Sequence, residues 1–175
     1  MKKPHEAHRS KGKHVLSFFL TTVSSSRFAK MRSGFAYTDE SGDLAEQIIR
    51  DNSHRVVKRY LIADDPKMIR SVVKGFFLSG ADVLVLTGGT GVSPTDVTVE
   101  TVVPYLEREL PGFGELLRSI SFKRIGSAAM LTRATAGTAN GKLILCLPGS
   151  PDGVETALRN FISEFPHVIA VAGKA

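Results

Sequence analysis

The sequence contains one cysteine and no tryptophan among its 175 residues. A single cysteine excludes a disulfide framework, and the apolar run at residues 143–147 predicts that Cys146 is a small buried side chain. No stretch approaches the roughly 18 consecutive apolar residues that a membrane-spanning helix needs. The amino-terminal stretch also lacks the apolar segment of a secretory signal. We therefore expect a cytoplasmic protein with no membrane partner.

Several catalytic signatures are missing as well. The five histidines show no metal-ligand spacing with Cys146, which argues against a zinc site. No Gly-x-Ser-x-Gly elbow supplies a serine nucleophile. The one glycine-rich segment lacks the lysine of a Walker A loop and does not fit the Gly-x-Gly-x-x-Gly spacing of dinucleotide-binding folds. These absences point away from a covalent nucleophile.

Positive charge is concentrated at the amino terminus. The net charge is +6, and residues 1–14 carry five basic side chains against Glu6 alone, which accounts for four of the six charges. We interpret residues 1–13 as a basic, mobile tail, because they show no apolar periodicity. Such a tail could contact RNA or an acidic partner. A solvated end is the favoured interpretation, so nucleic acid is not an expected partner.

Apolar periodicity predicts alternating strands and helices after this tail. Residues 14–175 are long enough for one domain with a full core. The alternation is typical of a three-layer α/β fold, in which a mostly parallel, doubly wound sheet carries helices on both faces. Strands are predicted over residues 14–22, 55–62 and 83–86, and helices begin near Ser41, Pro66, Val99, Phe113 and Pro151.

Local residue choices predict the helix boundaries. Asp65 followed by Pro66 fits an N-cap and the first helical position, and Gly80 fits a left-handed residue beyond the helix end. Thr98 is the expected cap of the next helix, whose apolar positions repeat as far as Leu110.

Two other segments have local signatures. Residues 131–136 and 142–147 predict a small antiparallel hairpin, because the Asn-Gly pair at 140–141 favours a tight turn. The connection at residues 24–39 is long, which suggests a function for it rather than a simple link.

The glycine-rich segment is the strongest functional signal in the chain. An apolar strand runs directly into Thr87-Gly88-Gly89-Thr90-Gly91, and Asp96 follows shortly after. Glycines let backbone N–H groups approach a phosphate closely. A carboxylate just beyond such a loop can hold the metal that accompanies a nucleoside triphosphate.

Other polar residues are expected at the same edge of the sheet. Asp64 follows the second strand, and the turn Pro148-Gly149-Ser150 follows the last one. Since ligands bind beyond the carboxyl ends of parallel strands, we expect Asp64, Asp96 and both glycine-bearing turns to share one cleft. Two carboxylates beside phosphate-binding turns favour metal-assisted phosphoryl or nucleotidyl transfer.

Each of these residues also has a purely structural interpretation. Asp64 could be a solvated strand end, and Asp96 could cap a short turn. Ser150 is a good N-cap for the final helix, although a helix N-terminus also attracts anions. Glu100 is assigned to the first turn of a helix, where the dipole stabilises its charge.

Taken in order, these motifs resemble the molybdopterin adenylyltransferase family, also called the molybdenum cofactor biosynthesis protein B group. The resemblance runs from about His14 to Phe165. It rests on residues 87–91, Asp96-Val97-Thr98, Pro111-Gly112-Phe113-Gly114-Glu115, residues 147–151 and an Asp-x-Ser-Gly segment, Asp39-Glu40-Ser41-Gly42.

The resemblance implies that molybdopterin is activated by ATP and Mg²⁺, giving adenylylated molybdopterin and pyrophosphate. It gives Asp64 and Asp96 a catalytic and metal-holding role. The substrate and nucleotide contacts that it implies are Thr87, Gly88, Gly89, Thr90, Gly91, Pro148, Gly149 and Ser150. It further implies a homotrimer or homohexamer, with hand-over of the product to a molybdate-insertion protein.

One position departs from the family pattern. Thr95 stands where the family often has an arginine that could bind an anion, so that task would pass to Arg27 or another residue. Two alternatives remain beside the enzyme. The chain could bind or scaffold molybdopterin without chemistry, or it could insert molybdate, although a single short domain argues against the latter.

Overall fold

The computed structural model describes residues 15–173. The predicted tail at residues 1–13 lies outside the described residues. Within them, no helix has both the length and the apolar character needed to cross a membrane.

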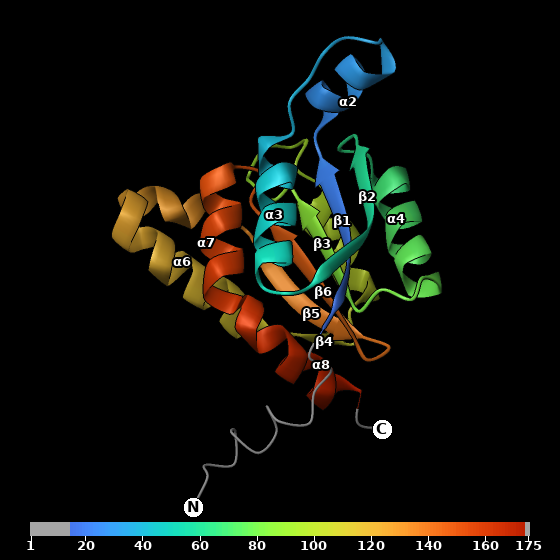
Figure 1. The fold of residues 1–175 in the computed structure, drawn as a ribbon. Helices are drawn as coiled ribbons and strands as arrows, with labels where there is room; N and C mark the ends of the chain where they lie inside the picture. The colour runs from blue at the N-terminus through green and yellow to red at the C-terminus, as the bar shows by residue number, and fades with distance from the viewer. Residues whose placement is uncertain (1–14, 174–175) are drawn as a thin grey trace, which may run out of the picture.

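A six-stranded sheet forms the centre of the molecule (Figure 1). In spatial order its strands are β2 (Arg55–Ile62), β1 (Ser17–Val23), β3 (Val83–Thr87), β6 (Lys142–Leu147), β5 (Thr135–Ala139) and β4 (Arg108–Glu109). The first four are parallel, whereas β5 pairs antiparallel with β6 and β4 pairs antiparallel with β5. The predicted mostly parallel sheet and its small antiparallel hairpin are confirmed.

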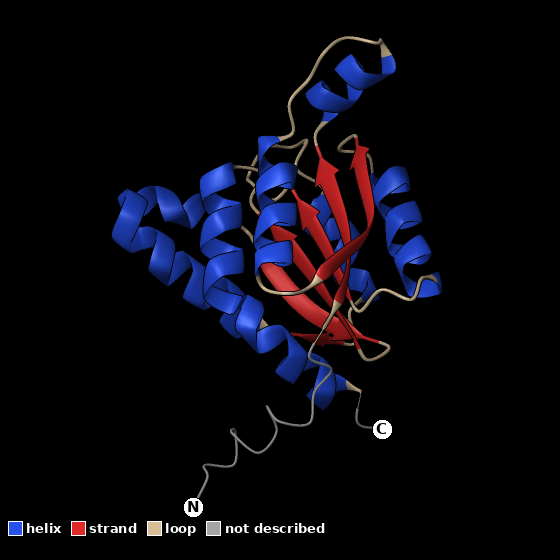
Figure 2. Cartoon of the chain, in the orientation of Figure 1, coloured by secondary structure: helices blue, strands red, loops and turns tan. Residues whose placement is uncertain are grey.

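Helices cover both faces of this sheet, so the three-layer prediction is also confirmed (Figure 2). One face packs against α3 (Glu40–Asp51), α6 (Pro111–Ile125), α7 (Pro151–Phe161) and α8 (Phe165–Ala172). The other packs against α4 (Pro66–Leu78) and the short α5 (Thr98–Val102).

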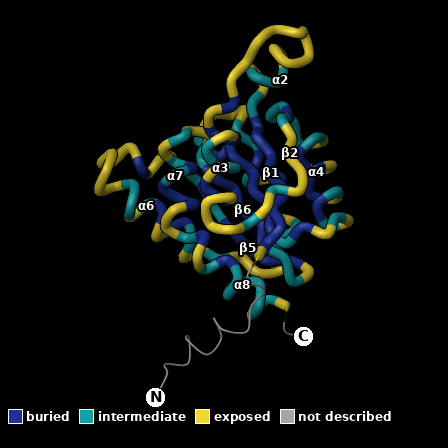
Figure 3. Tube along the Cα trace, in the orientation of Figure 1, coloured by how far each residue is buried: buried dark blue, intermediate teal, exposed yellow. Residues whose placement is uncertain are grey.

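Strand β1 shows why the sheet is central. All seven of its residues are buried, with Phe18 and Leu20 in one core and Phe19 and Val23 in the other. Burial on both faces is typical of a parallel strand between two helical layers. Strand β2 lies at one edge of the sheet and is largely exposed. Figure 3 shows this contrast between β1 and β2.

Several boundary predictions are confirmed residue by residue. Strand β2 has the predicted bounds. Asp65 caps α4 by accepting from the Lys67 N–H, and Ser150 caps α7 by accepting from the Gly153 N–H. Asn140 and Gly141 have φ values of 52° and 69°, as a tight hairpin turn with two left-handed residues requires.

Other boundary predictions are wrong, each for a local reason. Gly80 is not a left-handed cap, because α4 ends at Leu78 and the Ser79 hydroxyl donates to the Phe76 carbonyl. The helix predicted to extend to Leu110 ends at Val102, and Pro104 lies in a 3-10 turn at Val103–Tyr105. Proline cannot donate the next helical hydrogen bond and clashes with the preceding turn.

Two further expectations need correction. The hairpin strand predicted from residue 131 begins at Thr135, because Gly126–Leu131 forms a 3-10 helix. The connection at residues 24–39 contains the helix α2 (Ser25–Arg32), which has no buried residues. It projects from the end of the sheet at which β1 and β2 finish (Figure 1).

Candidate functional site

The glycine-rich loop is held between the carboxyl ends of β1 and β6. The Gly88 N–H donates to the Leu147 carbonyl at 3.0 Å. Gly88 has φ +112°, and a Cβ there would lie 2.1 Å from the Val23 carbonyl oxygen. Only glycine fits this position, because both the backbone conformation and the close approach exclude a side chain. The loop is therefore built into the scaffold.

Asp64 reaches the middle of this loop. A Cβ on Gly89 would lie 2.9 Å from Asp64 Oδ1. The other carboxylate oxygen, Oδ2, accepts from the Ser25 N–H at 2.8 Å and the Ser25 hydroxyl at 2.9 Å. The start of α2 thus orients Asp64 toward Gly89, which gives the long connection at residues 24–39 a place in the site.

Asp96 approaches the same loop two residues later. A Cβ on Gly91 would lie 2.8 Å from Asp96 Oδ2. Gly89 and Gly91 are two peptide units apart, so their Cα atoms are within about 7 Å of each other. Asp96 also closes a turn, because Oδ2 accepts from the Ser93 N–H at 2.9 Å. Its structural interpretation is therefore confirmed, and it is compatible with the predicted role in binding a metal ion.

The Pro148-Gly149-Ser150 turn lies against the glycine-rich loop. A Cβ on Gly149 would come within 3.1 Å of the Gly88 Cα. The Thr87 hydroxyl donates to the Pro148 carbonyl at 2.7 Å, and the Thr90 hydroxyl to the Leu147 carbonyl at 3.3 Å. Both threonines are buried, so their hydroxyl groups hold the two turns together.

A cavity of about 380 Å³ opens between these two turns. Its polar lining includes Asp96, and its apolar wall comes from the end of α6 and the following 3-10 helix. The residues that line it are Gly89, Thr90, Gly91, Asp96, Ser121, Ile125, Ala128, Ala129, Leu131, Thr132, Pro148, Gly149, Ser150, Asp152 and Gly153. Asp64 is not part of this lining and approaches the loop at Gly89. A larger cavity of about 710 Å³, lined by Glu107 and His167 among others, contains none of the predicted site residues.

Thr98 has a different role from the predicted one. The residue at the N-cap of α5 is Val97, and it makes no side-chain capping bond. The buried Thr98 hydroxyl instead donates to the Gly88 carbonyl at 2.8 Å, and its N–H donates to the Gly89 carbonyl at 3.0 Å. Thr98 therefore supports the loop rather than the helix.

Arg133 is a site residue that the sequence reasoning missed. Its Nε donates to the Gly91 carbonyl at 2.6 Å, and Nη2 donates to the Asp96 carbonyl at 2.9 Å. Its Nη1 pairs with Glu100, and that hydrogen bond lowers the pKa of the Glu100 carboxyl. Glu100 is thus structural, as expected. An isolated arginine before β5 gives no spacing signal that could have identified this role.

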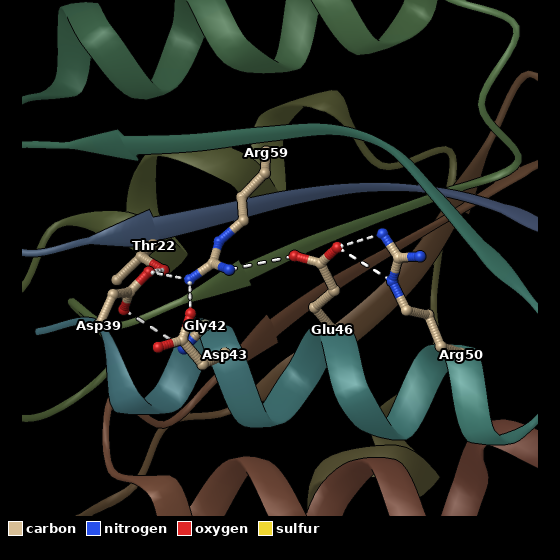
Figure 4. Close-up of polar contacts among 7 residues, drawn as sticks. All are labelled: Thr22, Asp39, Gly42, Asp43, Glu46, Arg50 and Arg59. Carbon is tan, nitrogen blue, oxygen red and sulfur yellow. Dashed lines mark hydrogen bonds and ion pairs between the residues drawn. The ribbon is translucent and has the colours of Figure 1, made fainter.

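The Asp-x-Ser-Gly segment forms the start of α3 beside the site (Figure 4). Asp39 is buried; it accepts from the Gly42 N–H and the Thr22 hydroxyl and pairs with Arg59. Burial of the Arg59 guanidinium lowers its pKa, but hydrogen bonds from Asp39, Asp43 and Glu46 outweigh this and raise the pKa above its usual value.

The position of the family arginine is taken by a short polar turn. The Thr95 and Ser93 hydroxyl groups are hydrogen-bonded at 2.9 Å. Arg27, the proposed substitute, is half-buried on α2, two residues beyond the Ser25 that holds Asp64. Arg133 contacts the loop, and its donors bind backbone carbonyls and Glu100.

No preformed metal cage exists in the described part of the chain. Residues 15–173 contain no group of three or more His, Cys, Asp or Glu side chains placed to hold one ion. Mg²⁺ is commonly bound by one or two carboxylates together with substrate phosphates. The carboxylates of Asp64 and Asp96 at one loop fit that ligand set.

Comparison with known proteins identifies the family. Residues 20–167 match the family model described as "Probable molybdopterin binding domain". The molybdenum cofactor biosynthesis protein B of Staphylococcus aureus strain MRSA252 is 42% identical over 136 residues, 75% of this chain and 81% of its own length. This chain belongs to the molybdenum cofactor biosynthesis protein B family.

Other members of the family agree with this assignment. The Bacillus cereus protein of the same name is 39% identical over 134 residues, 75% of this chain and 79% of its own length. The crystal structure of the tungsten cofactor synthesizing protein MoaB from Pyrococcus furiosus has a TM-score of 0.81 and 33% sequence identity. The alignment covers 93% of this chain and 99% of the Pyrococcus furiosus chain. The similarity therefore extends across the whole fold.

Proposed function

We propose that this protein catalyses the Mg²⁺- and ATP-dependent adenylylation of molybdopterin. In this reaction a terminal phosphate oxygen of molybdopterin attacks the α-phosphorus of ATP. The bond from that phosphorus to the bridging oxygen of the leaving group breaks, and pyrophosphate departs with the electron pair. The observation that carries the proposal is that Asp64 and Asp96 approach the same glycine-rich loop, at Gly89 and Gly91.

The residues of the two turns would bind and orient the phosphates. The N–H groups of Gly89, Thr90 and Gly91 would bind the phosphates, since the Gly88 N–H already donates to the Leu147 carbonyl and Gly89 is in a left-handed conformation. The amino terminus of α7 would add the Asp152 N–H and the positive end of the helix dipole, since Pro151 has no N–H and the Gly153 N–H is donated to Ser150. Positioning of this kind provides most of the catalysis in phosphoryl-group transfer.

Asp64 and Asp96 would hold the metal ion. When bound, Mg²⁺ neutralises charge on the triphosphate and on the departing pyrophosphate. Ser25 fixes Asp64, and Ser93 together with Arg133 fixes the segment that carries Asp96, so neither carboxylate needs to reorganise. Such preorganisation is the general basis of electrostatic catalysis.

The proposal includes the setting of the reaction. We propose a cytoplasmic homotrimer or homohexamer that passes adenylylated molybdopterin to a molybdate-insertion protein. Sedimentation velocity of the full chain tests the assembly.

A non-catalytic molybdopterin carrier or scaffold is the second candidate. It is favoured by the hydrogen bonds that already engage both carboxylates, from Ser25 to Asp64 and from Ser93 to Asp96. A carrier would need these aspartates only for the shape of the loop, and their charge would be dispensable.

Pyrophosphate release with purified molybdopterin, ATP and Mg²⁺ distinguishes the two candidates. We expect release by the wild type and a loss of about 100-fold or more in Asp64→Asn and in Asp96→Asn. Binding of molybdopterin, followed by fluorescence quenching, should persist in both variants. A wild type that binds molybdopterin but releases no pyrophosphate supports the carrier and defeats the enzyme.

A further inference from the structure

Arg59 connects the edge strand β2 to the first turns of α3 (Figure 4). Its Nη2 lies 2.9 Å from Asp39 Oδ2 and 2.6 Å from Asp43 Oδ1, and its Nη1 lies 3.0 Å from Glu46 Oε2. These contacts differ in weight. The Asp43 side chain is 67% exposed, whereas that of Asp39 is 9% exposed. Exposed ion pairs contribute little, so the contact with Asp39 matters most.

Asp39 depends on Arg59 because its carboxylate is buried. A buried charge is tolerated only when a partner of opposite charge and hydrogen bonds compensate it. The Thr22 hydroxyl, at 2.8 Å, and the Gly42 N–H, at 3.2 Å, supply neutral hydrogen bonds. Arg59 is the cation. A Cβ on Gly42 would lie 2.2 Å from Asp39 Oδ2 and 2.8 Å from Arg59 Nη2, so this packing also requires glycine there.

The same helical turn reaches the phosphate-binding turns on its other side. Ser41, two residues after Asp39, is fully buried, and its hydroxyl donates to the Gly149 carbonyl at 2.8 Å. Gly149 in turn packs against Gly88. A continuous set of contacts therefore runs from Arg59 through Asp39 and Ser41 to the place where the two turns meet.

We propose that Arg59 is a positioning residue that sets the spacing between the Pro148-Gly149-Ser150 turn and the glycine-rich loop. It acts through Asp39 and Ser41, because Arg59 does not line the cavity between the turns. This inference rests on the proposed function, since the spacing of the turns would determine how the terminal phosphate of molybdopterin is aligned with the α-phosphate of ATP.

The first test compares Arg59→Met with Arg50→Met. Arg50 pairs with Glu46 on the exposed side of the same helix, so its removal takes away one cation without touching Asp39. We expect kcat for pyrophosphate release to fall about tenfold in Arg59→Met with little change in KM, and to be unchanged in Arg50→Met. Arg59→Lys should recover part of the loss.

A double variant shows whether Asp39 carries the effect. Asp39→Asn removes the buried charge but keeps an oxygen for Thr22 and Gly42. In the Asp39→Asn background, Arg59→Met should cause little further loss of kcat, because no uncompensated charge remains. Additive losses would overturn the route through Asp39.

Amide hydrogen exchange of the substrate-free protein separates this inference from the proposed function. We expect about tenfold faster exchange at residues 147–153 in Arg59→Met, the size of losing about one hydrogen bond, and wild-type exchange there in Arg50→Met. Arg59→Lys and the double variant supply the same readout if Arg59→Met does not fold. If the wild type releases no pyrophosphate, the proposed function is wrong, and amide exchange at residues 147–153 still tests whether Arg59 positions the turn. Unchanged exchange at residues 147–153 overturns the role of Arg59.

Discussion

Arg59 and Arg133 stabilise neighbouring parts of the site in different ways. Arg59 is bound by three carboxylates and holds the start of α3. Arg133 directs two donors to backbone carbonyls, those of Gly91 and Asp96, and within residues 15–173 its one carboxylate partner is Glu100. The first arrangement depends on positive charge. The second depends on the planar fork of the guanidinium, which a lysine ammonium cannot reproduce.

The largest effect should therefore come from Arg133→Lys. We expect the rate of pyrophosphate release to fall about 100-fold, because the segment between Gly91 and Asp96 loses its fixed geometry. The same conservative change at Arg59 should cost much less. Steady-state rates of the two lysine variants measure the difference.

Glu100→Gln is the control for Arg133→Lys. It removes the ion pair but leaves both carbonyl contacts of Arg133 in place. The rate should stay close to that of the wild type. Equal losses in the two lysine variants would show that the guanidinium geometry matters equally at both arginines, and a large loss in Glu100→Gln would show that charge matters at Arg133 as well; either result would remove the contrast.

A smaller effect is expected at two adjacent threonines on the Arg59 side. The Thr22 hydroxyl donates to the buried Asp39, whereas the Thr21 hydroxyl is the buried polar side-chain atom in residues 15–173 that has no hydrogen-bond partner. Thr22→Val should lower the free energy of unfolding by about 1 kcal/mol, and Thr21→Val should leave it unchanged or raise it. Urea denaturation measures both, and the reverse order would refute the account of Asp39.

The smallest effect is expected at His54, whose side chain, unlike those of Arg59 and Arg133, acts as a hydrogen-bond acceptor. Nδ1 of His54 accepts from the Leu16 N–H at 3.3 Å, and burial lowers the pKa of His54 below its usual value. At pH values just below about 6.5, the unfolded chain therefore binds more protons at His54 than the folded protein does. The contribution of His54 to stability is complete above pH of about 6.5 and is lost progressively as the pH falls below it.

His54→Gln isolates that contribution. Thermal melts between pH 5 and pH 8 should show a shallower fall of Tm toward low pH in His54→Gln than in the wild type. Identical slopes would mean that the neutral form of His54 is not required.

Local chemistry explains which features of the fold were predictable. Asp65 before Pro66, Asn140 before Gly141 and Ser150 before Pro151 act through their own backbone, and each forms the predicted cap or turn. The convergence of the glycine-rich loop and the Pro148-Gly149-Ser150 turn followed from strand order alone. The caps and turns were predictable because they form within a few residues, and the convergence was predictable because parallel strands end at the same edge of the sheet.

The remaining features depend on contacts made across the fold. Thr98 looks like a cap but donates to Gly88, ten residues earlier. Arg59 and Arg133 reach partners on other elements, so their sequence neighbours give no sign of either role. Pro104 ends a helix whose apolar repeat continues to Leu110, because steric exclusion overrides periodicity.

Kinetics of the Asp64→Asn/Asp96→Asn double variant test most directly whether the two carboxylates serve one reaction. If both hold the same Mg²⁺, the double variant should release pyrophosphate no more slowly than the slower single variant, since either change alone disables the site. Losses that multiply would mean that Asp64 and Asp96 act independently, and would contradict a single metal-dependent site at the glycine-rich loop.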